Sequence, residues 1–250
     1  MNKMSTSNLS KNMLLENYAD SSKKFESLSV RTRDSVLDLN TVARLMVAKY
    51  KNTYKGIPFL KDAISQHMYL KLIDEVKPKT IIDLGTAAGG SAMWFYDISR
   101  AHSDCQIVTI DLQDMRHQTC MEQSNICFIQ EDVGNAAALK SILETRPHPW
   151  ILSEDCHAPS ALVMQTFAPH MTDGDYIIFE DTHPCAPDRP FMSADDMDNY
   201  TCEEWSKQKL KDVENEMLKR ADFLIDASVQ DMYGYNGATH INSVFCKKGR

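Results

Sequence analysis

Apolar and polar positions follow two patterns along this chain: short apolar runs and longer amphipathic stretches. From about residue 80 onward, short runs rich in Ile, Val and Leu are separated by longer amphipathic stretches. The short runs predict buried strands, and the longer stretches predict helices with one apolar face. The strands are expected at 80–84, 106–110, 126–130, 150–154 and 175–180. The helices between them are expected at 91–101, 113–123, 135–145 and 159–170.

The regular alternation of strands and helices predicts an α/β fold. We expect a Rossmann-like, doubly wound sheet of mostly parallel strands with helices on both faces. Two further strands, at 222–226 and 241–246, follow a charged helix at 202–220 and bring the sheet to seven strands. Apolar residues at helical spacing also predict two N-terminal helices, at 33–51 and 61–75.

Composition narrows the class of protein. The polar N-terminus, rich in Ser, Asn and Lys, predicts a flexible arm over 1–30 ahead of a single domain over 31–250. A formal net charge of −8 gives no support to a nucleic-acid partner. Seven cysteines without a C-x-x-C pair favour reduced thiols and a cytoplasmic location. No run reaches the ~20 apolar residues of a membrane helix. We expect a small-molecule substrate and leave a homo-oligomer open.

A glycine-rich turn follows the first predicted strand. The strand ends in an acid and the turn leads into a helix, so backbone N–H groups and a helix N-terminus can approach a ligand closely. Ala87 stands where a dinucleotide-binding fingerprint has its second glycine, which disfavours a nicotinamide cofactor. The acid suits the ammonium group of S-adenosylmethionine (SAM) instead. The cofactor contacts expected in this segment are Asp83, Gly85, Thr86, Ala87, Gly89 and Ser91.

Acids also follow the second and third predicted strands. Asp111 ends the second strand, where a carboxylate can accept hydrogen bonds from the two hydroxyls of a ribose. The alternative is that Asp111 caps the next helix. Asp132 follows the third strand and is expected near the adenine of the same cofactor.

A second group of polar residues follows the fourth and fifth predicted strands. Glu154, Asp155 and His157 come after one strand, and Glu180 and Asp181 come after the other. Carboxylates gathered so closely repel one another unless a cation or a proton intervenes, and an oxygen-rich cluster suits Mg²⁺. An imidazole beside such an ion can serve as a general base. Helix capping and a structural histidine are the alternatives.

These motifs together resemble the cephalosporin hydroxylase and rhamnosyl O-methyltransferase family, which is related to the macrolide-sugar O-methyltransferases. The resemblance runs from about Tyr54 to the C-terminus. It implies the class I methyltransferase fold, with SAM as the cofactor. The matching pieces are Gly56-Ile57-Pro58, Asp83 through Ser91, Ile110-Asp111, His157, Asp173-Gly174 and Glu180-Asp181-Thr182.

The resemblance also implies roles for single residues. In that family an acid three residues before the histidine joins the Glu-Asp pair in binding a divalent metal, and the histidine is the base. By position, the implied metal ligands are Glu154, Glu180 and Asp181, with Mg²⁺ as the expected ion, and the implied base is His157. The family has Asp where this chain has Glu154, so Asp155 is an alternative ligand.

The expected function is metal-assisted O-methylation of a small, hydroxyl-bearing metabolite, with SAM as methyl donor. Under this hypothesis His183, just after the Glu-Asp-Thr run, is a rival to His157 as the base. One alternative is an N-methyltransferase without a metal, in which the acids hold an amine or a guanidinium. Another is a partner protein that binds the cofactor without turnover. A nicotinamide dehydrogenase is the least favoured.

Overall fold

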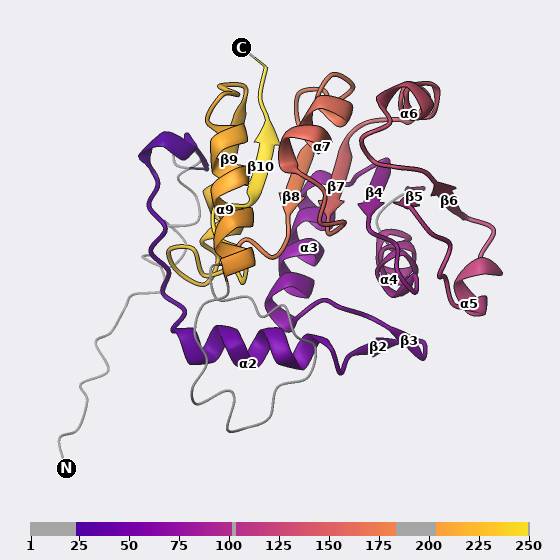
Figure 1. Ribbon diagram of the computed structural model, residues 1–250, viewed down its shortest axis with the longest axis horizontal. Helices are drawn as coiled ribbons and strands as arrows, with labels where there is room; N and C mark the ends of the chain where they lie inside the picture. The colour runs from indigo at the N-terminus through magenta and orange to yellow at the C-terminus, as the bar shows by residue number, and fades with distance from the viewer. Residues whose placement is uncertain (1–23, 102–103, 184–203, 250) are drawn as a thin grey trace.

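The computed structural model describes residues 24–101, 104–183 and 204–249. Its strands form one large sheet and a small hairpin (Figure 1). The strands of the large sheet are β1 (Phe25–Glu26), β4 (Thr80–Leu84), β5 (Gln106–Asp111), β6 (Ile126–Gln130), β7 (Trp150–Glu154), β8 (Tyr176–Phe179), β9 (Phe223–Asp226) and β10 (Val244–Lys247). The hairpin consists of β2 (Thr53–Tyr54) and β3 (Ile57–Pro58).

The sheet has the doubly wound topology that the alternation predicts. Its order is β1-β9-β10-β8-β7-β4-β5-β6. The five strands from β8 to β6 in this order are parallel to one another. β10 is antiparallel to both β8 and β9. All seven predicted strands are present. The eighth, β1, pairs with the edge strand β9 and lies within the stretch where a flexible arm is expected. Residues 1–23 of that arm lie outside the described residues.

The helices follow the predicted order, with shorter bounds. The segment expected as a helix over 113–123 has only one helical turn, because Asp114 accepts a hydrogen bond from the Arg116 amide and pairs with its side chain in a local turn. The helices are η2 (Leu28–Val30, 3₁₀), α2 (Leu39–Lys49), α3 (Ala63–Val76), α4 (Gly90–Ser99), α5 (Gln118–Met121), α6 (Ala136–Leu143), α7 (Ser160–Phe167), α9 (Glu204–Met217) and α10 (Ala227–Gln230).

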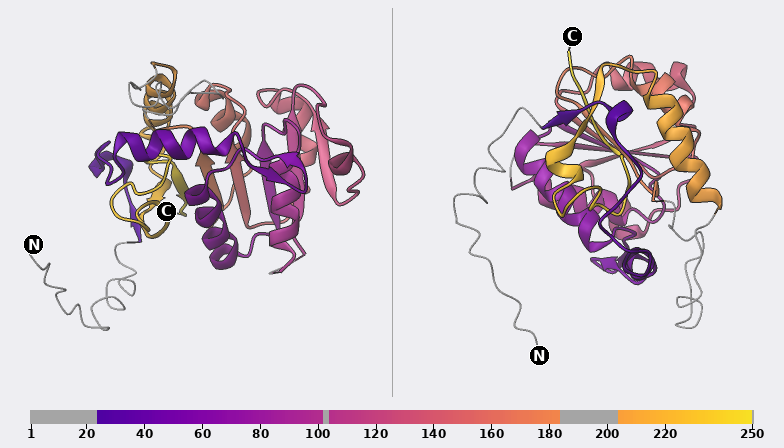
Figure 2. Two further views of the ribbon diagram at one scale, coloured as in Figure 1. Left: turned by 90° about the horizontal axis from the view of Figure 1, so that it is seen from below. Right: turned by 90° about the vertical axis from the view of Figure 1, so that its left-hand side faces the viewer.

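Helices cover the sheet on both faces, as Figure 2 shows. Consecutive strand residues point to opposite faces, so Ile81 joins the core beneath α3 and α4, whereas Ile82 joins the core beneath α6, α7 and α9. Each face buries an apolar cluster of its own. None of the described helices has the length and apolar character that crossing a bilayer requires.

The carboxyl ends of β4, β7 and β8 lie side by side because these strands are parallel neighbours. α2 crosses this edge of the sheet from outside the central fold (Figure 1). Its last residue, Lys49, reaches Asp181 just beyond β8. The fold therefore brings residues from distant parts of the chain to one edge, which is where doubly wound sheets bind ligands.

Candidate active site

The glycine-rich turn after β4 takes an unusual backbone path. Gly85 and Gly89 have φ values of 95° and 86°, and Ala87 has a φ of 44°. A left-handed alanine carries a steric cost, and here its amide donates a hydrogen bond to Asp111 Oδ2 at 3.0 Å. Asp111 thus holds the turn in place as well as facing the cavity beside it.

Gly85 is required by close packing. A Cβ at this position would lie 2.5 Å from the carbonyl oxygen of Asp155, so no other residue fits without moving the segment after β7. The clash is with protein backbone and would occur before any contact with a ligand. The turn after β4 and the segment after β7 therefore pack directly against each other.

Asp83 lies beneath this turn and is fully buried. Neither of its carboxylate oxygens has a hydrogen-bond partner among the described residues. Burial raises the pKa of Asp83 to about 7, although the nearby Lys61 acts in the opposite direction. A buried carboxylate without hydrogen bonds is costly, and this is a feature of sites that bind a polar or cationic ligand group.

Two adjoining cavities flank the glycine turn. The first, of about 360 Å³, lies between the ends of β5, β6 and β7 and contains Asp111 and Asp132 on its wall. The second, of about 220 Å³, lies beneath α2 and is lined by Thr86, Ser91 and Asp181, among others. Gly85, Ala87, Asp155 and His157 line both cavities. Of the predicted cofactor contacts, Asp83 and Gly89 line neither, because one is buried below the turn and the other faces Cys120.

Three side chains meet where the two cavities adjoin. Asp155, His157 and Asp181 each offer a ligand atom, and these atoms lie within 4.8 Å of one another. His157 and Asp181 both have left-handed backbones, with φ values of 57° and 55°. The Asp181 amide donates a hydrogen bond to Nδ1 of the buried His240 at 3.0 Å, which holds it in this strained conformation. Such strain is concentrated at functional sites.

Lysines from outside these strands pair with the acids that follow β7 and β8. Lys49 Nζ lies 2.7 Å from Asp181 Oδ1. Lys61, in the segment before α3, places Nζ 2.6 Å from Glu180 Oε1 and 3.1 Å from Asp155 Oδ2. The ammonium groups favour the charged forms of Glu180 and Asp181.

The pKa shifts follow from these ion pairs. Burial opposes the ionisation of Asp181, but Lys49 and the hydrogen bond from His157 outweigh it, so the pKa of Asp181 lies well below its ordinary value. Burial likewise opposes ionisation of Glu180, and the ammonium of Lys61 overcomes it, so the pKa of Glu180 is lowered. The same pairs raise the pKa of both lysines, although burial acts against them.

The three predicted metal ligands differ in their surroundings. Asp181 lies in the three-residue cluster, whereas Glu154 is fully buried and pairs with Lys209 of α9, with 3.0 Å between Oε2 and Nζ. Glu180 Oε1 also accepts hydrogen bonds from Tyr69 and Ser153. Asp155, the alternative ligand, belongs to the three-residue cluster, whereas Glu154 and Glu180 do not.

The two histidines considered as bases differ in their surroundings. The His157 side chain is 57% exposed, and Nε2 lies 3.7 Å from Asp181 Oδ2. The hydrogen bond to Asp181 raises the pKa of His157. His183 is buried, which together with His240 lowers its pKa to about 4. His157 is thus the histidine that lines the described cavities.

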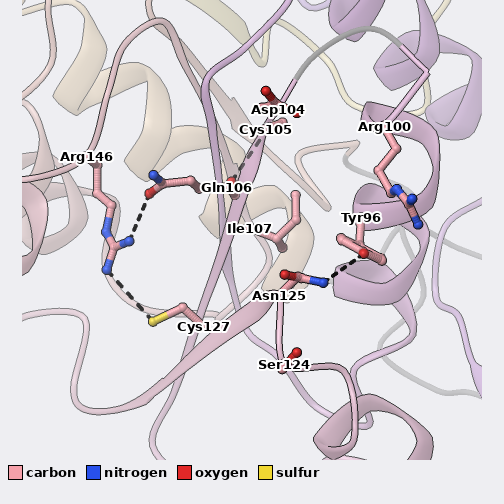
Figure 3. A pocket seen from close by; sticks show the side chains of 10 residues that line it. All are labelled: Tyr96, Arg100, Asp104, Cys105, Gln106, Ile107, Ser124, Asn125, Cys127 and Arg146. Atoms are coloured by element: carbon pink, nitrogen blue, oxygen red, sulfur yellow. Dashed lines mark hydrogen bonds between the residues drawn. The ribbon is translucent and has the colours of Figure 1, made fainter.

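The largest cavity lies at the opposite edge of the sheet. It measures about 630 Å³ and is built around the amino ends of β5 and β6, between Arg100 and Arg146 (Figure 3). Arg146 donates to Gln106 Oε1 at 2.9 Å. None of the predicted site residues lines this cavity.

Comparison with known proteins identifies the family. The family described as Rhamnosyl O-methyltransferase/CmcI matches residues 47–240, which is most of the chain. The chain belongs to this family. The match begins in the last turn of α2 and includes the glycine turn and the acids after β7 and β8.

Individual relatives of this family are more distant. The rhamnosyl O-methyltransferase of Mycobacterium leprae (strain TN) is 26% identical over 146 residues, which is 54% of this chain and 64% of the relative. That of Mycobacterium bovis (strain BCG / Pasteur 1173P2) is 26% identical over 149 residues, which is 55% of this chain and 61% of the relative. The chain thus spans a little under two thirds of the length of these curated relatives.

Solved structures agree with the fold. A CmcI-D160 structure with Mg and SAM is 25% identical, with a TM-score of 0.59 and coverage of 80% of this chain and 78% of that one. A CmcI-N160 structure with SAH (S-adenosylhomocysteine) is 22% identical, with a TM-score of 0.61 and coverage of 88% and 90%. The class I methyltransferase fold is thereby shown.

Sequence reasoning missed the three lysines. Lys49 continues the apolar face of α2, at helical spacing from Val42 and Met46, and Lys209 lies on the side of α9 that carries Val213. A lysine on a buried helix face is a usable signal, because it must find an acid there. No comparable pattern marks Lys61, which lies in a loop.

Proposed function

We propose that this protein is a SAM-dependent methyltransferase that methylates a hydroxyl group of a small molecule with the help of a divalent cation. The observation that carries the proposal is the pair of adjoining cavities at the carboxyl edge of the sheet. One holds the glycine turn and Asp111, the other holds Asp181, and Asp155 and His157 line both. This arrangement supports a methyl donor in one cavity and an acceptor in the other, with the cluster of acids between them.

The cofactor fits the first cavity and the buried acid beneath the turn. Asp111 Oδ2 accepts a hydrogen bond from the Ala87 amide and Oδ1 accepts one from the Gln113 amide at 3.4 Å, and each oxygen has a second lone pair that can accept from a ribose hydroxyl. Asp132 is proposed beside the adenine, on the same cavity wall. The two oxygens of Asp83 that lack hydrogen bonds suit a cationic donor group such as the SAM ammonium.

The acids suit a hard divalent cation. Asp155 gives one oxygen to Lys61 and Asp181 gives one to Lys49, so each keeps a second oxygen directed at the shared space. Oxygen ligands of this kind are those that Mg²⁺ prefers. We propose Asp155 and Asp181 as ligands. Glu154 and Glu180 are both buried, paired with a lysine and outside the three-residue cluster, so their roles as ligands stay predictions. The bound ion would orient and acidify the substrate hydroxyl.

His157 is proposed as the general base. Its Nε2 can take the proton of the substrate hydroxyl as that oxygen attacks the methyl group, while the carbon–sulfur bond of the sulfonium breaks and SAH leaves. Asp181, 3.7 Å from Nε2, stabilises the imidazolium that forms. The raised pKa of His157 makes it a stronger base than a free imidazole.

Calorimetry and a transfer assay test the proposal together. SAH should bind the purified protein with and without Mg²⁺, and labelled SAM should methylate polyhydroxylated acceptors but not matched primary amines. EDTA should abolish or strongly reduce this transfer, and Mg²⁺ should restore it. Full activity after exhaustive dialysis against EDTA would instead favour an N-methyltransferase in which the lysine-paired acids contact the substrate. Tight SAH binding without any transfer would favour a partner protein.

Three further predictions from the sequence, on location and partners, remain to be tested by experiment. These are the cytoplasmic location, the absence of a nucleic-acid partner and the choice between a monomer and a homo-oligomer. Cell fractionation, a nucleic-acid shift assay and analytical ultracentrifugation test them in turn.

A further inference from the structure

The carboxyl edge of the sheet holds more acids than lysines. Five carboxylates gather there, and all are buried except Asp155, which is partly buried. Three lysines oppose them through short contacts. The described residues of this edge are therefore short of positive charge, apart from what the histidines contribute. The acids are Asp83, Glu154, Asp155, Glu180 and Asp181, and the lysines are Lys49, Lys61 and Lys209.

Of the three lysines, Lys49 is the one that contacts Asp181 at the proposed metal position. Its Nζ lies 2.7 Å from Asp181 Oδ1, and its side chain is only 6% exposed. Lys49 also lines the 220 Å³ cavity, together with Tyr50 and both acids of the cluster. An ion bound to Asp181 Oδ2 would therefore be separated from this ammonium by a single carboxylate group.

We propose that Lys49 is a built-in competitor cation that weakens the affinity of this site for divalent metal. This inference rests on the proposed function, because it assigns Asp181 to the ion. Lys49 neutralises part of the charge of Asp181 and repels a second cation nearby. The ion is then held firmly only when further oxygen atoms, such as the hydroxyl groups of the substrate, complete its coordination.

The other lysines are less suited to this role. Lys209 engages Glu154, which does not belong to the three-residue cluster. Lys61 has a fully buried side chain that bridges Asp155 and Glu180, so its loss would remove the charge partner of the buried Glu180 and of the partly buried Asp155 and destabilise the fold. Lys49 joins a single acid of the cluster and ends a helix, so its charge can be removed with less disturbance.

The direction in which the Kd for metal changes in Lys49→Met tests the proposal. Mn²⁺ binding is measured by calorimetry and by electron paramagnetic resonance, in the presence of saturating SAH. Removal of a like charge one carboxylate away should tighten the Kd for Mn²⁺ about tenfold or more. Lys49→Arg keeps the charge and should keep the wild-type Kd. Lys55→Met removes a half-exposed lysine that pairs with Asp97 far from the site, and it should also leave the Kd unchanged.

The contrary results are equally definite. If Lys49 is only an anchor for Asp181, its loss disorders the carboxylate, and Lys49→Met binds Mn²⁺ as weakly as the wild type or more weakly, which overturns the proposal. Lys49→Gln repeats the test, and failure of both neutral variants to fold also marks Lys49 as an anchor. If neither the wild type nor a folded neutral variant binds Mn²⁺, the metal-assisted function fails as well. Wild-type binding without tightening in the variants leaves that function standing.

Discussion

The carboxyl edge and the amino edge of the central sheet both carry cavities, but they hold charged side chains in different ways. At the amino edge, Arg100 and Asp104 are exposed and line the cavity of about 630 Å³, which is larger than either cavity described at the carboxyl edge (Figure 3). At the carboxyl edge, Lys61 and Glu180 have side chains that are 0% and 1% exposed and lie 2.6 Å apart. Water solvates the first set of charges, whereas only protein partners stabilise the second.

This difference shows that the size of a cavity does not indicate which cavity belongs to the candidate active site of this protein. Burying charges costs free energy even when they are paired, and a chain of this size is only marginally stable. A fold that keeps five acids and three left-handed non-glycine residues, Ala87, His157 and Asp181, at one edge carries that cost in one place. Such costs are typical of binding and catalytic sites. At the amino edge, Lys77 has a left-handed backbone and Asp175 is fully buried, but the carboxylate of Asp175 accepts hydrogen bonds from the amides of Trp150 and Thr172.

The largest expected effect at the carboxyl edge comes from His157→Ala. Loss of the general base should lower kcat about 10²–10⁴-fold, while the affinity for SAH stays nearly constant. Because Asp181 raises the pKa of His157, the rate should fall as pH decreases, with a midpoint above the ordinary histidine value of about 6.5. Steady-state kinetics across pH 5–9 measure both.

His183→Ala is the comparison for this test. His183 is buried and its pKa is lowered to about 4, so its loss should leave the pH profile unchanged. A variant pair in which only His183→Ala loses turnover would reverse the roles. If neither variant loses turnover, O-methylation with a histidine base is refuted.

Asp83 should make stability depend on pH in a way that no residue of the amino edge does. Its pKa is about 7 when folded and about 3.9 in an unfolded chain, so the folded state binds the proton more tightly. Its contribution is fully present below pH 4 and is lost as the pH rises to 7, by an amount on the order of 4 kcal/mol. Urea unfolding should show this slope in the wild type and not in Asp83→Asn. Equal slopes in the two proteins would contradict it.

Asp111→Ala should weaken cofactor binding more modestly. The variant loses the proposed ribose contacts and the hydrogen bond to the Ala87 amide. Hydrogen bonds to a charged group contribute about 1.5–3 kcal/mol, so the Kd for SAH should rise about tenfold or more. Calorimetry on a protein with an unchanged circular dichroism spectrum provides the measurement. An unaltered Kd would remove Asp111 from the site.

Arg146→Ala should have the smallest effect and completes the comparison. Arg146 is partly exposed and hydrogen-bonds to Gln106 at the amino edge. Its loss should change the free energy of unfolding by no more than about 0.5 kcal/mol and leave SAH binding and turnover at wild-type levels. A tenfold change in either would show that the two edges are coupled and would break the distinction between them.

The sequence by itself determined the order and position of most elements, because short apolar runs and amphipathic spacing act locally. The strands over 126–130 and 150–154 have the predicted bounds. Local pattern was less informative over 113–123, where side chains of a polar segment compete with the helix for backbone hydrogen bonds. The two-residue strand β1 had no apolar run to reveal it, since pairing with β9 alone defines it.

Only the tertiary structure decided how the acids of the site are held. Sequence spacing brought the residues after β7 and β8 to one edge, because parallel strands end together. It could not show that Lys49, Lys61 and Lys209 arrive there from three other elements, or that Lys209 engages Glu154 while Asp155 faces the cavities. Ion pairing acts through space between residues far apart in the chain, so only the folded chain determines which acid meets which lysine.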